Sequence, residues 1–184
     1  MSMMELLNRA ENKAKERKPE VAHTLRTKYA WMSAGAARAA GVKPATLTVN
    51  DNDFIIFSFA DGQEQEIQAN VKIPDDMDTD EDCAFCIGWS SPTISQDCDW
   101  EVTYLVSAVG EDTDQAGTTL QEYEESSSTA DGLVVSDGFT IAAANVSATD
   151  ICFHVVIARD GNDASDNLGD VAELHGIALK YTPK

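Results

Sequence analysis

The stretch Glu66-Ile-Gln-Ala-Asn-Val-Lys-Ile73 alternates between polar and apolar side chains over eight residues. Successive side chains of a β-strand point to opposite faces of a sheet, so this pattern predicts a strand with one face in a core and one face in water. Clusters of Asp, Asn, Gly, Ser and Pro separate this stretch from other β-rich runs, which is typical of strands joined by turns. The stretch therefore indicates an antiparallel β protein.

Runs of similar character recur from Thr46 to the end of the chain. The sequence predicts eight strands, near Phe54–Phe59, Gln65–Ile73, Ala84–Trp89, Trp100–Ala108, Thr118–Tyr123, Phe139–Ala142, Ile151–Arg159 and His175–Tyr181. Because no helix between them is long enough to link parallel neighbours, we expect an eight-stranded antiparallel jelly-roll sandwich, with a closed barrel as the alternative.

The formal charge divides the chain into two unlike parts. Residues 1–44 contain nine Lys and Arg residues against four acids, a charge of +5, whereas residues 45–184 contain four bases against 28 acids, a charge of −24. An acidic body of this kind repels polyanions, so we expect no nucleic-acid partner. No apolar run approaches the roughly 20 residues of a membrane span, so we also expect no membrane association.

Residues 1–44 have the apolar spacing of helices. Apolar side chains recur in steps of three and four from Val21 to Ala39, and Gly41 and Pro44 end the pattern. We therefore expect a basic N-terminal α-helical arm over residues 1–44 and an acidic β-sandwich domain over residues 45–184. The apolar stripe either packs on its own domain or docks on a neighbouring subunit. The basic residues either form a solvated face or complement acidic surfaces, of a partner or of the acidic body itself. The expected partner interface is Val21, Leu25, Arg26, Lys28, Tyr29, Trp31, Met32 and Ala36.

The four cysteines do not predict a metal or redox site. Cys83 and Cys86 form a C-x-x-C pair, but the pair lies in a predicted strand, which sends the two side chains to opposite faces. No second pair and no neighbouring histidine completes a zinc set. We expect buried, reduced cysteines, with a disulfide and a metal site as the less favoured alternatives.

Acidic loops and catalytic motifs give no strong site either. Asp76, Asp78 and Asp80 match the start of a calcium loop, but Glu81 and Ile87 stand where that loop needs a glycine and a bidentate glutamate. These three residues are therefore only weak calcium candidates, and an acidic turn is the favoured interpretation, as it is for the loop that begins at Asp160. Motifs for nucleophilic, phosphate-binding or zinc chemistry are absent from the sequence, so we expect no enzymatic activity and no cofactor.

Two kinds of side chain could have other roles. His154 lies within an apolar run, which favours a hydrogen-bonded core histidine over a catalytic base. Aromatic residues could form a sugar-stacking platform on a jelly roll, but those inside alternating strands are first expected in the core. They are Trp89, Trp100, Tyr104 and Tyr123.

Several segments together resemble a known family. They are Ile73-Pro-Asp-Asp-Met-Asp78, a strand ending Ile87-Gly-Trp89, Asp99-Trp-Glu-Val-Thr-Tyr104, Phe153-His-Val-Val-Ile-Ala-Arg-Asp160 and the final His175-Gly-Ile-Ala-Leu-Lys-Tyr181. Over residues 54–184 this order resembles the jelly-roll cement, decoration or head-fibre-base proteins of tailed bacteriophages. In such proteins the jelly roll commonly sits on the outer capsid surface, often as a trimer, and an N-terminal extension ties neighbouring major capsid subunits together. The basic helical arm departs from the family pattern.

The resemblance implies a structural role without catalytic residues. It predicts a capsid cement or decoration protein that is assembled in the host cytoplasm, is found on the virion surface, and has the major capsid protein and its own copies, as a trimer, for partners. A cyclic trimer matches the three-fold positions of a capsid. The alternative function is a carbohydrate- or receptor-binding jelly-roll module of a tail fibre or head fibre.

Overall fold

The computed structural model describes residues 26–49 and 55–184, which form β-strands and two short 3-10 helices, η1 (Ala34–Ala36) and η2 (Ala143–Asn145). The strands are β1 (Lys28–Ser33), β2 (Arg38–Ala39), β3 (Thr46–Val49), β4 (Ile55–Phe59), β5 (Glu64–Lys72), β6 (Cys83–Ser90), β7 (Asp97–Ala108), β8 (Thr118–Glu125), β9 (Val134–Val135), β10 (Phe139–Ile141), β11 (Asp150–Asp160) and β12 (Ala172–Tyr181).

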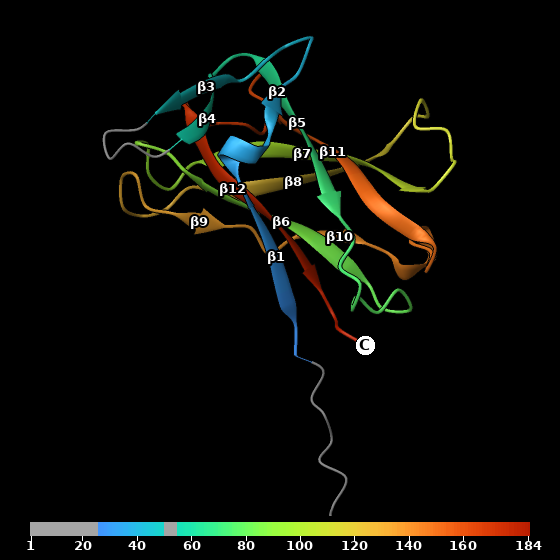
Figure 1. Cartoon of the computed structure of the whole chain (residues 1–184). Helices are drawn as coiled ribbons and strands as arrows, with labels where there is room; N and C mark the ends of the chain where they lie inside the picture. Colours follow the sequence, from blue (N-terminus) through green and yellow to red (C-terminus); the bar gives the residue numbers. More distant parts are fainter. Residues whose placement is uncertain (1–25, 50–54) are drawn as a thin grey trace, which may run out of the picture.

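Two antiparallel sheets pack face to face as a sandwich (Figure 1). In sheet A the strands lie in the order β10-β6-β12-β4-β3, with β1 added beside β12 and β9 beside β6. Sheet B has the order β2-β5-β11-β7-β8. The eight predicted strands correspond to β4 to β8 and β10 to β12, and their distribution between the sheets is that of a jelly roll. The predicted sandwich is therefore confirmed, whereas the described residues contain twelve strands and not eight.

The core lies between the sheets and is built from the inward residues of the alternating strands. Aromatic side chains fill its centre, where the ring centroids of Trp89 and Trp100 are 5.8 Å apart and Phe59 meets Trp100 edge to face at 5.1 Å. Trp89, Trp100 and Tyr104 are buried, as predicted. Tyr123 is not, because it lies on the outward face of β8 with about half of its surface exposed.

Residues 28–33, which lie within the segment predicted as a helical arm, are part of sheet A. Residues 28–33 form β1 and pair with Gly176–Tyr181 of β12. The prediction of a helix is wrong here because β12 has ten residues and β4 pairs only with its first three, Ala172–Leu174. The remaining N–H and C=O groups of β12 need partners on that side, and β1 supplies them.

The side chains of β1 then alternate as in any strand. Ala30 and Met32 pack against the core, while Tyr29 and Trp31 lie on the outer face of the sheet. The helical spacing from Val21 to Ala39 therefore does not reflect a helical face over the described part. Val21 and Leu25 lie outside the described residues.

After β1 the chain turns through η1 and reaches the other sheet. Ala34 in η1 is fully buried, and Arg38–Ala39 of β2 pairs with Ile67–Gln68 of β5. The chain between Lys28 and Ala39 thus adds one strand to each sheet. Within the described ranges, no helix has the length and apolar character needed to cross a membrane.

Candidate functional site

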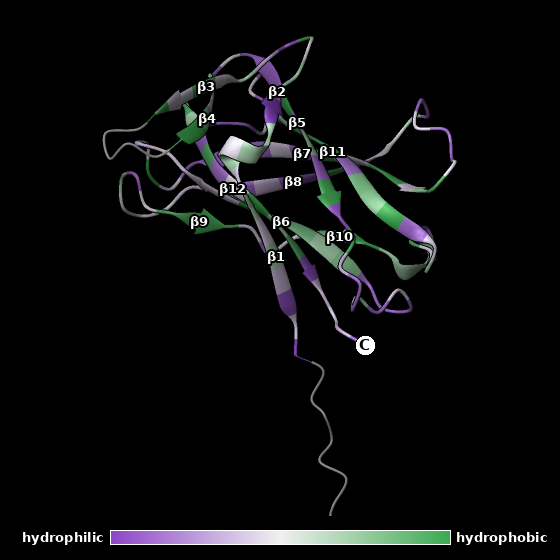
Figure 2. Cartoon of the chain, in the orientation of Figure 1, coloured by the Kyte–Doolittle hydropathy of each residue, from purple (hydrophilic) through white to green (hydrophobic). Residues whose placement is uncertain are grey.

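An apolar patch covers part of the outer face of sheet A. It consists of Tyr29 and Trp31 from β1, Val135 from β9, and Leu133 just before β9, and each of these side chains is about half exposed or more. Val135 pairs with Gly88 on the far side of β6, and a Cβ built on Gly88 would lie 3.6 Å from the Trp31 ring and 3.8 Å from Leu133. We call these four residues the β1 patch. In Figure 2, β9 is drawn in the green of apolar residues.

A small apolar hollow of about 290 Å³ lies within the patch, lined by Trp31, Leu133, Gly88, Gly176 and His175 among others. The absence of a side chain at Gly88 leaves space beside the Trp31 ring, whereas Gly176 lets the backbone of β12 come close to that of β1. The Nε2 atom of His175 is 2.9 Å from Ser90 Oγ, and partial burial lowers the pKa of His175 below its usual range. Trp31 thus belongs to the exposed patch and also forms one wall of the hollow.

Lys28, predicted to contact a partner, contacts the protein's own body. Its Nζ lies 2.5 Å from Asp76 Oδ2, and the Tyr181 hydroxyl donates to the other Asp76 oxygen at 3.1 Å. The hydrogen bond from Lys28 lowers the pKa of Asp76. This cluster holds the start of β1, the end of β12 and the loop after β5 together.

The same cluster bears on the weak calcium candidates. Asp76 is engaged by Lys28 and Tyr181, and Asp78 Oδ1 accepts the backbone N–H of Asp80 at 3.1 Å, as in an acidic turn. Among the residues that the structure describes, no group of three or more His, Cys, Asp or Glu side chains is arranged to hold a metal ion.

The other basic residues of this segment also lie against acidic or polar groups of the body. Lys43 pairs with Glu64, and Arg38 Nη2 is 3.4 Å from Gln68 Oε1. Arg26 and Ala36 are exposed. Of the two explanations for the basic charge, complementarity to the body itself therefore accounts for Lys28 and Lys43.

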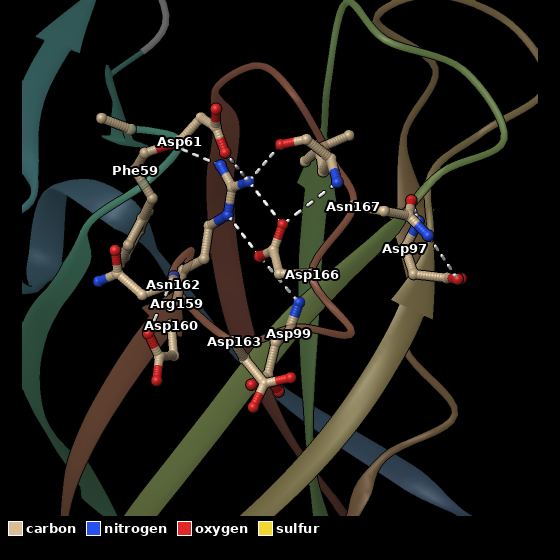
Figure 3. Close-up of polar contacts among 12 residues, drawn as sticks. Phe59, Asp61, Asp97, Asp99, Arg159, Asp160, Asn162, Asp163, Asp166 and Asn167 are labelled. Atoms are coloured by element: carbon tan, nitrogen blue, oxygen red, sulfur yellow. Dashed lines mark hydrogen bonds and ion pairs between the residues drawn. The ribbon is translucent and has the colours of Figure 1, made fainter.

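A buried ion pair organises the acidic loop between β11 and β12 (Figure 3). Arg159 Nε and Nη2 each lie 2.8 Å from one oxygen of Asp166, and neither side chain exposes any surface. The remaining guanidinium donors reach the backbone oxygens of Phe59, Leu168 and Asp170. All five N–H groups of Arg159 are thus used to fix the loop, which identifies this cluster as structural.

Asp99 lies beside that loop, but its carboxylate, unlike that of Asp166, is only partly hydrogen-bonded. Its Oδ2 accepts a hydrogen bond from Gln121 Nε2 at 2.8 Å, whereas its buried Oδ1 has no partner among the described residues. Burial raises the pKa of Asp99 to about 6, and the neighbouring Asp163 and Glu101 act in the same direction. Figure 3 shows Asp99 next to Asp163.

A groove of about 540 Å³ lies on the outer face of sheet B, at the other end of that sheet. We call it the sheet B groove. Polar side chains of β2, β5, β7, β11 and the loop after β7 line it, among them Arg38, Gln68, Asn70, Thr103, Thr113, Gln115 and His154. His154 is hydrogen-bonded through both ring nitrogens, as predicted, with Nδ1 2.9 Å from Asn70 Oδ1 and Nε2 2.9 Å from Ser107 Oγ. The predicted core position is wrong, because His154 lies on the outer face of sheet B, where it is partly buried and forms part of the groove floor.

The cysteines occupy packed positions. Cys83, Cys86 and Cys98 are buried, Cys152 is partly buried, and all four are free. Burial raises the pKa of Cys83 to about 12 and raises that of the other three thiols. A thiol that resists ionisation is a poor nucleophile and a poor metal ligand, so these residues act as small apolar side chains.

Sequence reasoning identified Tyr29 and Trp31 but missed the rest of the two surfaces. Leu133 and Val135 belong to a short apolar run that follows Gly132, which was a usable signal for a short strand. Gln68 and Asn70 are the outward positions of the alternating stretch that indicates the fold, so their place on a wet face was predictable. The groove itself was not, since it depends on which strands become neighbours.

No protein-family model and no curated protein matches the chain. Among solved structures, the exo-β-1,3-galactanase of Phanerochaete chrysosporium aligns with a TM-score of 0.47 and 7% identity, covering 83% of this chain and 29% of the galactanase. The C-terminal CBM6 of the Zobellia galactanivorans laminarinase LamC aligns with a TM-score of 0.44 and 10% identity, covering 83% of this chain and 98% of that module. An infectious bursal disease virus structure, Gx strain, gives 0.39 and 11% over 85% of this chain and 32% of the viral chain. This chain thus spans less than a third of the galactanase and of the viral protein.

Proposed function

We propose that the protein is a non-enzymatic structural protein of a phage virion, a cement or decoration protein that binds the outside of the head and stabilises contacts between major capsid subunits. The β1 patch is the observation that carries this proposal. Two aromatic and two aliphatic side chains gather there on the surface of a chain with a net charge of −19. Exposed apolar groups of this kind favour burial against another protein.

The position of the patch supports the same role. β1 begins at Lys28, a few residues after the segment 1–25 in the sequence. We propose that this segment and the patch contact the same neighbouring subunit. We place the capsid contact at this end of sheet A, with the acidic loops directed to solvent.

The available charges and the number of equivalent capsid sites determine how strong each contact must be. Lys28 and Lys43 are paired with the body's own acids, so attraction to a partner rests on apolar contact more than on these bases. A capsid presents many equivalent sites, and modest contacts reinforce a shell when they are repeated. A homotrimer around a three-fold position remains part of the proposal on grounds of symmetry. The helical stripe no longer supports the trimer, because residues 28–33 form a strand.

The alternative function, carbohydrate or receptor binding, would need a surface other than the aromatic platform that the sequence suggested. Trp89, Trp100 and Tyr104 are buried and cannot stack on a sugar. Of the four aromatic residues considered for such a platform, only Tyr123 is exposed. The aromatic platform therefore gives no support to this alternative.

Binding to purified heads of the source phage that lack the protein tests the proposal. We expect the full chain to co-sediment with such heads, and a Trp31→Ser, Leu133→Ser variant to bind at least roughly tenfold more weakly, because it loses the apolar contact. A Val109→Ser variant is the matched control, since Val109 is 85% exposed and lies in the loop after β7, away from the patch.

Two outcomes of this experiment would contradict parts of the proposal. If the patch variant decorates heads at wild-type occupancy, the patch is not the contact. If the full chain itself does not bind heads at all, the virion role is wrong.

A further inference from the structure

The sheet B groove has a composition unlike the rest of the molecule. The chain contains 32 acidic residues, yet no Asp or Glu is among the described residues that line this groove. The other end of the same sheet face is acidic, since the pKa of Glu101 is raised by burial and further by Asp160, Glu64 and Asp163 around it. The groove lining itself is thus free of acids, although the loop after β7 that supplies Gln115 also carries Glu111, Asp112 and Asp114.

Arg38, Gln68 and Asn70 give the groove hydrogen-bond donors. Gln115 keeps its amide oxygen as an acceptor, because its Nε2 donates to the Asp112 backbone oxygen at 3.1 Å, and Thr103 Oγ1 shares a hydrogen bond of 2.7 Å with Thr119 Oγ1. Arg38 has five N–H donors, of which one lies 3.4 Å from Gln68 Oε1, and none of the described carboxylates forms an ion pair with it. Because that contact uses the amide oxygen of Gln68, the Gln68 NH₂ group is left to donate. A donor-rich groove around one guanidinium suits a ligand that brings acceptor oxygens, and above all a carboxylate.

The floor of the groove is held in one arrangement. Asn70 Oδ1 only accepts hydrogen bonds, so His154 donates through Nδ1–H and its Nε2 accepts from the Ser107 hydroxyl. Ser107 is buried and anchors this chain of contacts in β7. The amide nitrogen of Asn70 is then free to donate toward a ligand, beside the donors of Gln68 and Arg38. Side chains fixed before a ligand arrives lower the entropic cost of binding.

Apolar groups complete the lining. Leu105 and Val156 belong to the outward faces of β7 and β11, and both line the groove next to Thr103 and His154. A sugar ring has hydroxyl groups on its rim and C–H groups on its faces, so it suits a surface that alternates amides and hydroxyls with aliphatic side chains. The volume of about 540 Å³ is in the range of small-molecule sites.

We propose that the sheet B groove binds an acidic saccharide, with the ligand's carboxylate on Arg38 and Gln68 and its hydroxyls on Asn70, Thr103 and Gln115. This site goes beyond the proposed virion role and does not rest on it, because the groove and the β1 patch lie on opposite sheets. A protein anchored by sheet A would present sheet B, and with it the groove, to the outside.

Binding of the full chain to an array of glycans with and without carboxylates tests the site. We expect binding to oligosaccharides that contain sialic or uronic acid, and roughly tenfold weaker binding to neutral counterparts such as lactose against 3′-sialyllactose. The measurement is made at about 0.15 M salt, where the Debye length of about 8 Å limits repulsion from the acidic body. In NMR titrations the amide signals of residues 68, 70 and 154 should shift.

Three variants separate the groove from general charge effects. Arg38→Gln should weaken binding to 3′-sialyllactose roughly tenfold or more. Asn70→Asp keeps an acceptor for His154 but adds a negative charge to the groove, so it should abolish binding to acidic glycans. Lys180→Gln is the control, because it changes the net charge as Arg38→Gln does but lies on β12 of the other sheet, where it should leave binding unchanged.

Any of the following results would overturn the inference. The site is absent if no acidic glycan on the array binds, or if acidic and neutral glycans bind alike. It is misplaced if Arg38→Gln and Lys180→Gln weaken binding equally, or if Asn70→Asp binds as the wild type does while its thermal unfolding shows it to be folded.

Discussion

Arg159 and Asp166 form a bidentate ion pair from which water is excluded, with both N–O distances at 2.8 Å. Asp166 also accepts the backbone N–H groups of Asp99 and Leu168, so its two oxygens satisfy four donors. The pair therefore connects β11, β7 and the loop before β12 at one point.

Removing one member of this pair should be among the most destabilising single changes in the chain. Asp166→Ala leaves a buried guanidinium without its counter-ion, which costs about 3–5 kcal/mol in comparable pairs. Urea denaturation measures the loss, with Asp61→Ala as the control, since Asp61 is half exposed and 3.7 Å from Arg159. A loss below about 1 kcal/mol for Asp166→Ala would mean that the loop can rearrange to solvate Arg159.

Asp99 should make stability depend on pH near 6. Its pKa in the folded protein, about 6, is above the ordinary value of 3.8, so the folded state binds the proton more tightly than the unfolded state. The resulting stabilisation is present at low pH and is lost as the pH rises through about 6. Asp99→Asn, which cannot ionise, should therefore raise the free energy of unfolding by about 1–2 kcal/mol at pH 8 and by less at pH 5.

The comparison needs a charge-matched control. Glu122→Gln removes one acid from an exposed position of β8 and should have the same small effect at both pH values. Equal effects of Asp99→Asn at pH 5 and pH 8 would show that Asp99 is ionised throughout this range.

Truncation should distinguish residues 1–25 from the strands that follow them. A chain of residues 26–184 keeps β1 and β2, whereas residues 45–184 lack both and leave Gly176–Tyr181 of β12 without a neighbour on the side opposite β6. We expect the shorter chain to unfold at a lower temperature and to associate through the open edge of β12. Differential scanning calorimetry and size-exclusion chromatography measure these effects, and equal thermal stability of the two chains would mean that β1 contributes nothing to the sandwich.

Replacing Gly176 even with alanine should lower the free energy of unfolding. A Cβ at this position would lie 2.8 Å from the backbone oxygen of Met32, so Gly176→Ala pushes β1 away from β12 and should cost about 1–3 kcal/mol. Gly41→Ala is the control, because a Cβ there meets nothing within 4 Å. The unfolding free energies of the two variants should differ clearly, and similar values would indicate that β1 shifts at no cost.

The sequence predicted eight of the strands because most of them are long β-rich runs, several of which alternate as Glu66 to Ile73 does, although β10 has only three residues. The strands that were missed lacked a signal of this kind. β2 and β9 have two residues each and form because a neighbouring strand offers unpaired backbone groups, which is a property of the assembled sheets. For β1, steps of three and four residues coincide with a helical period by chance, while the true alternation of Tyr29 and Trp31 with Ala30 and Met32 extends over only a few residues.

The candidate surfaces were predictable in part for the same reason. Trp31 was singled out because it lies beside the apolar stripe, and it is exposed. Lys28 was assigned to a partner, but its partner is Asp76, 48 residues away, which no local pattern reveals. The groove required Gln68, Thr103 and His154 to come together from three strands, and that depends on the order of strands within sheet B.

Sheet A joins the first described strand of the chain to the last, since residues 28–33 of β1 pair with residues 176–181 of β12. During synthesis, β1 emerges from the ribosome long before its neighbour exists, and no other described strand pairs with it. Contacts between segments so far apart in sequence form slowly because a long loop must close first. The Trp31 face of the sheet is therefore completed only after Tyr181 has left the ribosome, and until then β1 is an unpaired segment whose apolar side chains are open to premature contacts.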